Sequence, residues 1–511
     1  MKPQFLFCLV VSIILSSCTA GIDPPNLPLA SETSPVEPTD TRQPTLLPAA
    51  ATDLPPTVAP ALLPTLNQVV PFYRLRVELT TSSDWTTLEL LNPENVLSVR
   101  QLNTVWAPDD TAAEFSTLRL GQSLAAAEAS TRVAMTTDYA IAPAALDQPL
   151  NFLLQKGALN SSTVRIYNLI GETTSLLLAV EHQSVVARDP DTNPLAFSLD
   201  LERLRAVPPR EATCGCPDIT PMVWAFYYPW YYQNDWESNL LVDHPVEQYA
   251  SSDPQAIARH IEQAQSAGID GFITSWWGPG TETDRNLAIL LDLAEERDFK
   301  VAIYFETLDN GVGRMENEIF AWIDYVFHTH GEHPAYMRLA GQPVIVLWAT
   351  QAVTPVHWTI VSNALYLQGQ EAVLIGMGYT AANLDLFDGF HDYGVFAYPN
   401  LTQTFAQASR MARYFSLLMD DPQPKIFAAT VQPGYDDHLL PDRAGGQVQD
   451  RQEGDFYRST WEAALASDPD WVFITSWNEW WETTQIEPSE SYGDLYLQLT
   501  REYVDRWKDQ E

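Results

Sequence analysis

Residues 471–482 read Trp-Val-Phe-Ile-Thr-Ser-Trp-Asn-Glu-Trp-Trp-Glu. The first five, Trp471 to Thr475, are all β-branched or aromatic and have the length of a buried strand. The tryptophans and carboxylates that follow stand where such a strand would end. In a parallel sheet with helical crossovers that end carries the functional side chains, so this stretch predicts a strand and a site together.

The same pattern, an apolar strand followed by a helical stretch, recurs through residues 217–511. The predicted strands are Met222–Tyr228, Gly271–Ser275, Val301–Phe305, Pro343–Leu347, Ala372–Met377, Leu386–Phe390, Ile426–Val431 and Trp471–Thr475. The predicted helices include Asp253–Ala267, Thr283–Glu296, Asn317–His330, Thr404–Met419 and Tyr492–Lys508. Strands alternating with helices over this length predict the α/β class and a (β/α)₈ TIM barrel.

A doubly wound open sheet is the competing fold for this region. Such a sheet carries a Gly-rich phosphate-binding turn after its first strand. Here that position holds Tyr227-Tyr228-Pro229-Trp230-Tyr231, which contains no glycine. The barrel is therefore the favoured prediction.

The first 18 residues predict an export signal. Lys2 gives a short positive start, and Phe5 to Leu15 is apolar but too short to span a bilayer. The run Leu15-Ser16-Ser17-Cys18 resembles the bacterial lipobox, in which cleavage leaves the cysteine as a lipidated N-terminus. An ordinary signal peptide is the alternative. We therefore expect an extracytoplasmic lipoprotein, at the cell surface or in the periplasm, that contacts the membrane only through a lipid on Cys18.

Two further segments separate this signal from the barrel. Residues 19–66 are rich in Pro and Thr and predict an extended linker. Residues 67–210 hold short alternating runs and predict an all-β module, with a sandwich as the favoured architecture. The predicted strands are Tyr73–Thr80, Thr86–Leu91, Ser116–Leu120, Ser162–Asn168, Thr174–Val180 and Leu195–Leu201. The module either binds carbohydrate or serves as a stalk, and the second role is slightly favoured.

The composition of the chain limits the classes of molecule that it is expected to bind. A formal net charge of −38 repels phosphate backbones, so we expect no nucleic-acid binding, whereas a neutral polysaccharide is compatible with it. The histidines are scattered, and Cys214 and Cys216 are too close for an unstrained disulfide and too few for zinc. No phosphate loop or Gly-x-Ser-x-Gly elbow occurs. We expect no metal, no cofactor and a monomer.

Aromatic residues gather where the predicted barrel strands end. Tyr228 and Trp230 follow the first strand, Trp276 and Trp277 the second, and Glu306 the third. Tryptophan and tyrosine faces stack on sugar rings while their polar atoms bond hydroxyl groups. One such cluster is usually core, but several at strand ends together with carboxylates predict a carbohydrate cleft.

Glu479 and Glu482 are the candidate catalytic pair. Their spacing of three residues brings both side chains to one side of a helical turn. Glycosidic cleavage needs one carboxyl group to donate a proton while another acts as base or nucleophile. The neighbouring tryptophans exclude water, and burial with mutual repulsion raises the pKa of one carboxyl. A solvated surface pair is the alternative. Asn478, directly before Glu479, could hold a substrate hydroxyl or orient a glutamate.

These motifs resemble a known family. The run from Ile474 to Pro488 (ITSWNEWWETTQIEP) looks like the signature of glycoside hydrolase family 99, the endo-α-mannosidase and endo-α-1,2-mannanase family. The segments Tyr227–Tyr231, Trp276–Gly278 and Pro433–Asp437, which includes Tyr435, resemble the family in the same order. The resemblance covers nearly all of Met222 to Lys508.

The resemblance implies an endo-acting, retaining hydrolase. Glu479 would be the base that acts on the sugar 2-hydroxyl and gives a 1,2-anhydro intermediate, and Glu482 the general acid/base. Glu306, Tyr393, Tyr435 and Arg451 fall where the family places substrate contacts, and Trp276 or Trp277 would line the subsite next to the cleaved bond.

Two departures from the family pattern affect the leaving-group side. Trp481 and Thr483 stand where the family usually has His and Gly, and the loop after Tyr231 is altered. The leading hypothesis is an endo-glycosidase acting on α-linked mannose-type or related glycans. A glycosidase of other linkage, such as an α-glucanase, and a non-catalytic glycan-binding surface lipoprotein remain the alternatives.

Overall fold

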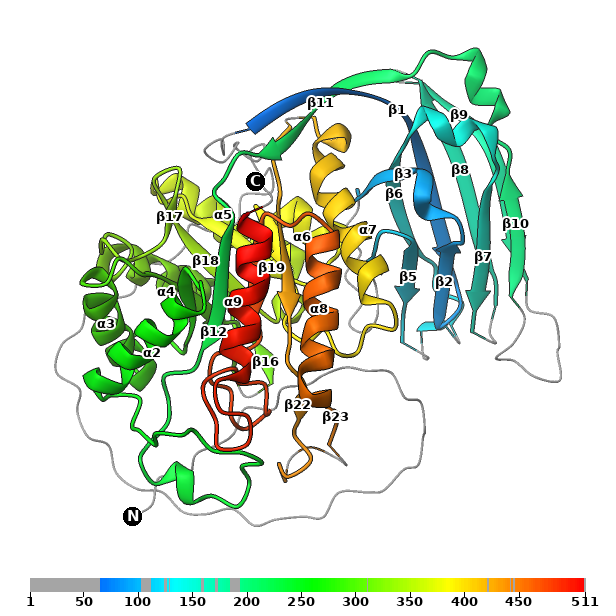
Figure 1. Cartoon of the computed structure of the whole chain (residues 1–511). Coiled ribbons are helices and arrows are strands. Elements are labelled where there is room, and N and C mark those ends of the chain that lie inside the picture. The colour runs from blue at the N-terminus through cyan, green and yellow to red at the C-terminus, as the bar shows by residue number, and fades with distance from the viewer. Residues whose placement is uncertain are drawn as a thin grey trace, which may run out of the picture.

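A computed structural model of the 511-residue chain shows a β-sandwich beside an α/β barrel (Figure 1). The structure describes residues 65–102, 112–123, 126–127, 129–157, 160–170, 173–183, 194–309, 311–420, 422–441, 443 and 446–509. The predicted signal peptide, the lipidation site Cys18 and almost all of the predicted linker lie outside the described residues.

The second part of the chain is a closed parallel barrel. Its strands follow the order β14-β13-β12-β24-β21-β20-β19-β18, and β14 also pairs with β18. The strands are β12 (Met222–Tyr227), β13 (Gly271–Trp276), β14 (Lys300–Glu306), β18 (Gln342–Trp348), β19 (Val373–Met377), β20 (Gly389–His391), β21 (Ile426–Val431) and β24 (Trp471–Ile474). The predicted (β/α)₈ barrel is confirmed, and closure through β14 and β18 excludes an open sheet.

The continuous apolar runs form strands because both faces of each strand are buried. In β12, Val223 and Ala225 point outward to the core beneath the helices, whereas Trp224 and Phe226 fill the barrel interior. At the far end of β24, Trp471 donates from Nε1 to the carbonyl of Thr220 at 3.3 Å. The alternation matters for the site, because it decides which residues at a strand end face the barrel mouth.

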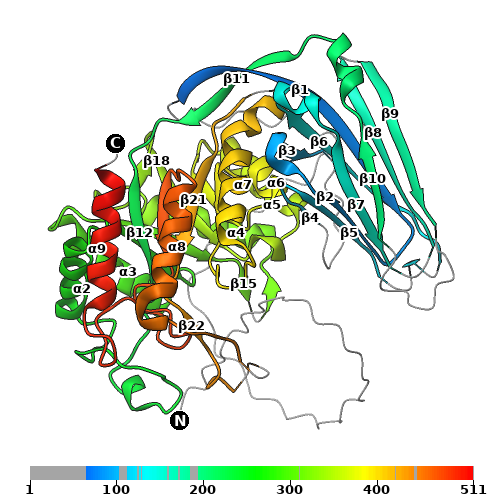
Figure 2. The same cartoon turned by 45° about the vertical axis from the view of Figure 1, so that its right-hand side comes forward.

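Helices alternate with the strands and cover the barrel (Figures 1 and 2). They are α2 (Pro254–Ser266), α3 (Glu282–Glu295), α4 (Glu316–Thr329), α5 (Pro355–Leu367), α6 (Ala381–Leu386), α7 (Leu401–Tyr414), α8 (Asp455–Ala466) and α9 (Leu495–Lys508). Asp253 begins α2 by accepting from the amide of Gln255, with Pro254 at the first helical position. Among the described residues, no helix is both long and apolar enough to cross a membrane.

The sixth barrel strand departs from its predicted bounds of Leu386–Phe390. Leu386 instead ends α6, whose first turn is capped by the Thr380 side chain, and β20 covers only Gly389–His391. Asp388 lies between them and accepts from the amide of Leu374 at 2.9 Å. The helix therefore takes the start of the apolar run, and only its end joins the sheet.

The N-terminal module consists of two antiparallel sheets. One has the order β3-β6-β1-β8-β9 with β11 paired to β1, and the other β10-β7-β2-β5-β4. Their strands are β1 (Thr65–Thr81), β2 (Trp85–Leu90), β3 (Val96–Gln101), β4 (Ala112–Ala113), β5 (Thr117–Gly121), β6 (Val133–Ile141), β7 (Leu150–Lys156), β8 (Ser162–Ile170), β9 (Thr173–His182), β10 (Leu195–Leu199) and β11 (Arg210–Pro217). Leu79 of the first sheet and Leu118 of the second are fully buried in one core, so the all-β prediction is confirmed.

The module extends further than the predicted range of 67–210. Strand β11 pairs with the start of β1, Thr65 opposite Pro217, and the two arch over the upper end of the barrel in Figure 1. The backbone of Cys214 and Cys216 lies in β11, and their side chains are outside the described residues.

The sandwich rests on the side of the barrel formed by α6 and α7 (Figure 2). Ser98 on β3 donates to the carbonyl of Met411 at 2.9 Å, and Arg100 pairs with Asp385 at 2.9 Å. Phe72 packs against Leu418 in a small apolar cluster. Direct polar and apolar contacts therefore fix the module against the barrel.

Candidate active site

The candidate site lies on the loop that follows β24. This loop folds back on itself through backbone hydrogen bonds: Ser476 donates to Thr484 at 2.8 Å, Ile486 to Ser476 at 2.9 Å and Glu487 to Trp477 at 2.9 Å. Residues 480–483 form a turn, where the spacing of the two glutamates predicted a helical turn. A closed loop of this kind holds both candidate glutamates in fixed positions.

Glu479 is buried, with 4% of its surface exposed. Its amide donates to Ser476 Oγ at 2.8 Å, and its Oε1 accepts from the amide of Trp481 at 3.1 Å. The other oxygen, Oε2, is buried and accepts no hydrogen bond from the described residues. A buried acceptor without a partner is costly, so this oxygen is well placed to take a hydrogen bond from a ligand.

Glu482 has a charged partner. Its Oε1 accepts from Arg443 Nη2 at 2.8 Å, and Arg443 also lies 3.3 Å from Asp437 Oδ2. Tyr435, predicted as a substrate contact, donates its hydroxyl to the same Asp437 oxygen at 3.0 Å. The loop after β21 therefore supplies a cation and a buried acid that surround the second glutamate.

The two carboxyl groups influence each other. Burial and then the charge of Glu482 raise the pKa of Glu479 well above its usual value. Burial also raises the pKa of Glu482, while Arg443 opposes that rise. Because the groups repel each other in a dry site, the pair binds a proton more readily than two exposed glutamates would. One acid and one base can thus coexist near neutral pH.

Tyrosine and tryptophan side chains form a wall beside the pair. Tyr228 donates its hydroxyl to Tyr393 at 2.6 Å, and its ring lies 4.7 Å from that of Trp230. Burial, then the charges of Glu482 and Glu479, raise the pKa of the Tyr393 hydroxyl. Trp230 and Trp481 are only half-buried. The predicted residues Tyr228, Trp230 and Tyr393 therefore come together with the carboxylates.

The ends of β13 and β14 add a further acid. Ser275 donates to Glu306 Oε1 at 2.7 Å and lies 3.1 Å from the Trp277 indole nitrogen, which donates to it. Burial raises the pKa of Glu306 to about 8. Glu306 is therefore mostly protonated at neutral pH and can donate as well as accept a hydrogen bond. The half-buried indole of Trp277 lies beside it.

Trp276 lies on the other face of β13. It is fully buried, donates from Nε1 to Asp284 at 2.9 Å, and packs against Trp322 at 5.4 Å between ring centres. Successive strand residues point to opposite faces, so Ser275 and Trp277 face the barrel mouth whereas Trp276 faces the helices. Of the two tryptophans predicted for the subsite, the geometry leaves only Trp277 as a candidate.

Two other predicted contacts hold the loops in place. Arg451 donates to the carbonyls of Thr483 at 3.0 Å and Gln485 at 2.9 Å, and its guanidinium stacks on Tyr496. Asn478 is fully buried, accepts from the amide of Tyr228 at 2.7 Å and donates to its carbonyl at 3.1 Å. Both side chains hold the backbone of the loops, and Arg451 does so through Nη2 alone. Its Nε and Nη1 are buried and have no hydrogen-bond partner among the described residues, so Arg451 stays a candidate for a substrate contact.

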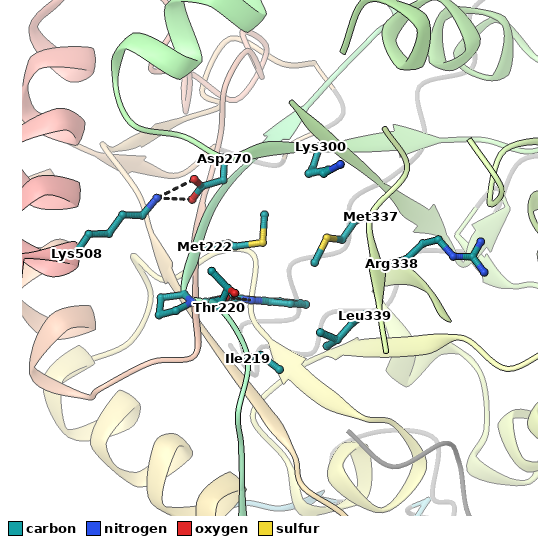
Figure 3. Close-up of a pocket in the computed structure, with 11 residues that line it drawn as sticks. Ile219, Thr220, Met222, Asp270, Lys300, Met337, Arg338, Leu339 and Lys508 are labelled. Atoms are coloured by element: carbon teal, nitrogen blue, oxygen red, sulfur yellow. Dashed lines mark hydrogen bonds and ion pairs between the residues drawn. The ribbon is translucent and has the colours of Figure 1, made fainter. Parts of the chain in front are cut away.

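A cavity lies at the opposite end of the barrel and lacks these acids (Figure 3). It measures about 540 Å³ and is lined at the starts of strands by residues such as Met222, Lys300 and Trp471. The Lys508–Asp270 pair, 2.7 Å apart, closes one side. In a (β/α)₈ barrel the amino-terminal end of the strands is the stability face, so we do not assign the chemistry there.

The model of glycosyl hydrolase family 99 matches residues 233–508, more than half of the chain. The chain belongs to this family. As a family 99 member it is a glycoside hydrolase, and the prediction of an enzyme acting on O-glycosyl bonds is confirmed. The match begins after Trp230, so the aromatic residues at the end of β12 lie outside it.

Relatives of this family 99 protein are similar at a modest level. A glycoprotein endo-α-1,2-mannosidase of Rattus norvegicus is 26% identical over 375 residues, which span 59% of this chain and 78% of the relative. A glycoprotein endo-α-1,2-mannosidase-like protein of Homo sapiens is 26% identical over 297 residues, spanning 51% and 63%. The structure of an endo-α-mannosidase of family 99 from Bacteroides thetaiotaomicron has 24% identity and a TM-score of 0.50, covering 56% of this chain and 98% of that chain, which supports the shared fold.

Proposed function

We propose that the protein is an endo-acting, retaining glycosidase of α-linked mannose-type glycans that works through a 1,2-anhydro sugar. The observation that carries the proposal is the buried pair after β24. Glu479 presents an oxygen with no partner among the described residues, and Glu482 is balanced between burial and Arg443. Membership in family 99 and the similarity to endo-α-1,2-mannosidases support the sugar.

Although burial raises the pKa of Glu479 well above its usual value, the reactive form of the pair is the one in which the proton lies on Glu482. In the first step Glu479, as carboxylate, takes the proton of the 2-hydroxyl. The 2-oxygen then attacks the anomeric carbon while the bond to the leaving oxygen breaks, and Glu482 gives its proton to that oxygen. In the second step Glu482, now a carboxylate, removes a proton from water, which opens the anhydro ring at the anomeric carbon. Glu479 returns its proton to the 2-oxygen. Two inversions give net retention, and both glutamates regain their starting states.

Arg443 suits the change of charge on Glu482 during this cycle. The neutral acid is favoured by burial, and the carboxylate that forms after proton transfer is favoured by the guanidinium 2.8 Å away. Neither state is therefore strongly disfavoured, which is the requirement for a group that must act as acid and then as base.

The aromatic wall supports a carbohydrate substrate. Trp230, Trp277 and Trp481 are half-buried and offer ring faces to sugar rings, while Tyr393 and Glu306 offer hydrogen-bonding groups. We propose Tyr228, Trp230, Trp277, Glu306 and Tyr393 as the substrate-contacting set.

The test is product analysis on linkage-defined α-mannans and α-glucans. We expect internal cleavage of an α-mannan, with the retained anomer detected first by NMR, and no cleavage by the Glu482→Gln variant. Cleavage of α-glucans alone would show that the enzyme is an α-glucanase. If no polymer is cut while binding persists, the binding-lipoprotein alternative holds.

We also propose that Cys18 carries a lipid and keeps the enzyme outside the cytoplasm. The lipobox-like run that ends at Cys18 supports this, and the Pro-rich residues 19–66 would hold the barrel away from the membrane. In a bacterial host, the full chain should fractionate with membranes and incorporate a labelled fatty acid, whereas Cys18→Ala should do neither. A wild-type chain without label would leave only the ordinary signal peptide.

A further inference from the structure

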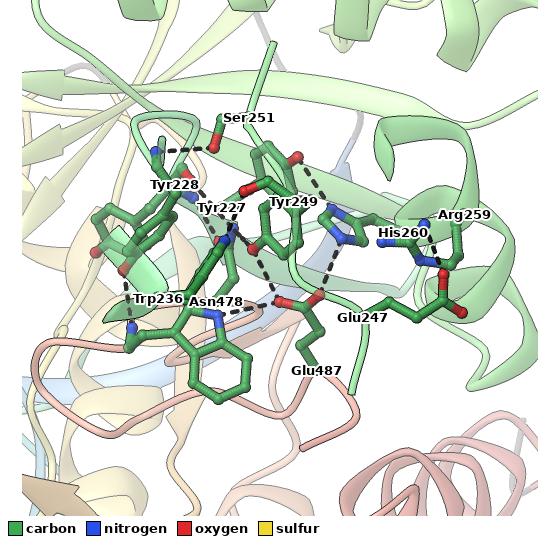
Figure 4. Close-up of polar contacts among 12 residues, drawn as sticks. Tyr227, Tyr228, Trp236, Glu247, Tyr249, Ser251, Arg259, His260, Asn478 and Glu487 are labelled. Atoms are coloured by element: carbon green, nitrogen blue, oxygen red, sulfur yellow. Dashed lines mark hydrogen bonds and ion pairs between the residues drawn. The ribbon is translucent and has the colours of Figure 1, made fainter. Parts of the chain in front are cut away.

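Behind the candidate catalytic loop lies a buried carboxylate, Glu487, to which the mechanism above gives no step. Only 5% of its surface is exposed. Its Oε2 accepts from Tyr249 Oη at 2.9 Å and from Trp480 Nε1 at 3.1 Å, and its Oε1 lies 2.9 Å from His260 Nε2 (Figure 4). The two donors come from the loop before α2 and from the catalytic loop, and His260 comes from α2.

These contacts hold both neighbours of Glu479. Trp480, directly after Glu479, is bonded to Glu487 through its indole. Asn478, directly before Glu479, donates from Nδ2 to Tyr249 Oη at 3.1 Å, and that hydroxyl donates onward to Glu487. The two residues that determine where the Glu479 backbone lies are thus tied to one carboxylate.

The remaining neighbour of Glu487 is a histidine. His260 is fully buried, and its Nδ1 lies 3.2 Å from the Tyr227 hydroxyl. His260 Nε2 lies 2.9 Å from Glu487 Oε1, an ion-pair distance, but it makes no hydrogen bond within the described part of the chain. Glu487 Oε2 therefore accepts two hydrogen bonds, from Tyr249 and Trp480, an arrangement that suits an acceptor-only carboxylate.

We infer that Glu487 is a positioning residue that fixes Glu479 through Trp480 and, by way of Tyr249, through Asn478. The expected change in kcat rests on the proposed function, whereas the expected placement of the catalytic loop does not. Glu487 is separated from the reacting atoms by the loop itself and makes no contact with Glu479. Its effect must therefore reach the reaction through the placement of the base.

Glutamine at this position would keep the shape but not the charge. Its amide oxygen is a neutral acceptor, so the hydrogen bonds from Tyr249 and Trp480 would be weaker than those to a carboxylate. The catalytic loop would then be held less firmly in place. A displacement of about 1 Å in a reacting group costs on the order of 10²-fold in rate.

The experiment compares Glu487→Gln with wild type and with Asp470→Asn. Asp470 is a matched control, because it is a half-buried acid at the opposite end of β24 that accepts from the amide of Phe427 at 2.8 Å. We expect kcat on the cleaved α-mannan to fall about 10²-fold in Glu487→Gln, with KM within about threefold of wild type. Asp470→Asn should keep its kcat.

The double variant decides whether Glu487 acts through Glu479. If it does, Glu479→Gln and Glu479→Gln/Glu487→Gln have the same residual kcat, because the group being positioned is already lost. A further fall of the same size in the double variant would overturn the inference, and so would an unchanged kcat in Glu487→Gln.

Hydrogen exchange tests the geometry without any activity. The amides of residues 479, 480 and 481 donate to Ser476, Tyr231 and Glu479 side chains. In Glu487→Gln these amides should exchange faster than in wild type or Asp470→Asn, with the other barrel strands unchanged. Unchanged exchange at 479–481 would refute the inference. A wild-type chain that cuts no glycan would refute the proposed function only, and the exchange result would still stand.

Discussion

Glu479→Gln is expected to lower kcat by about 10³- to 10⁴-fold, whatever leaving group the substrate carries. The amide cannot take a proton from the 2-hydroxyl, so the 2-oxygen cannot attack the anomeric carbon. A better leaving group does not help, since the missing group acts on the nucleophile. The measurement is single-turnover cleavage of a natural glycan and of the matching aryl glycoside, and both rates should fall by a similar factor.

The control for this variant is Glu490→Gln, an exposed glutamate in the same segment. Its kcat should stay within about twofold of wild type, because exposed substitutions away from special features change little. Glu479→Gln should remain folded and bind glycan, since Glu479 Oε1 accepts only one backbone hydrogen bond and glutamine keeps an oxygen for it. A loss below about tenfold would rule out Glu479 as the base.

The barrel could be predicted almost strand by strand because its strands are buried on both faces. Ile426–Val431 was predicted with the observed bounds, and Gly271–Ser275 differs from β13 by the single residue Trp276. In such strands the apolar run and the strand coincide. The apolar run that begins at Leu386 belongs partly to α6 and partly to β20. The sequence alone could not show where the helix ends and the strand begins.

The sandwich was harder, because several of its strands bury polar groups. Strand β6 was not predicted, and its centre contains the fully buried Thr137 and Asp138. Asp138 is accommodated by Arg74 at 2.7 Å and Arg76 at 2.8 Å, both on β1. The buried carboxylate is tolerated because of a tertiary contact with β1, which the sequence of β6 does not show. Polar residues at buried positions also break the apolar–polar alternation by which a strand is recognised.

Some residues of the candidate site could also be predicted from the sequence, and others could not. Glu479 and Glu482 could be found because they follow a recognisable strand, and Tyr228, Tyr393 and Trp277 were placed beside them. Arg443 was missed, since it lies in a long loop after β21 with no periodic pattern to show which residue points inward.

Two residues predicted to contact the substrate have side chains that face other parts of the protein, for reasons that are equally physical. Trp276 is one residue away from Ser275 and therefore faces the helices, and Arg451 is drawn to the free carbonyls of Thr483 and Gln485. Sequence spacing alone identifies a strand end, but the direction of each side chain there depends on the exact residue at which the strand ends.

Glu482→Gln should show the opposite dependence on the leaving group. On a natural glycan, whose departing sugar oxygen needs a proton, kcat should fall about 10³-fold. On the matching aryl glycoside, whose phenolate departs without protonation, the first step should stay within about tenfold of wild type. The burst of phenol measured by stopped flow separates this step from the hydrolysis that follows, where the missing base matters again.

The pH dependence of kcat/KM is a second test of Glu482→Gln. Wild-type kcat/KM on the natural glycan requires Glu482 to be protonated, so activity is lost as pH rises through the pKa of Glu482. Burial raises that pKa, so the basic limb should lie above that of an ordinary exposed glutamate even though Arg443 opposes the rise. With the aryl glycoside, Glu482→Gln should lose the basic limb and keep the acidic limb that reports Glu479. If the basic limb persists in Glu482→Gln, another group, with Glu306 and its pKa of about 8 as the first candidate, is the acid.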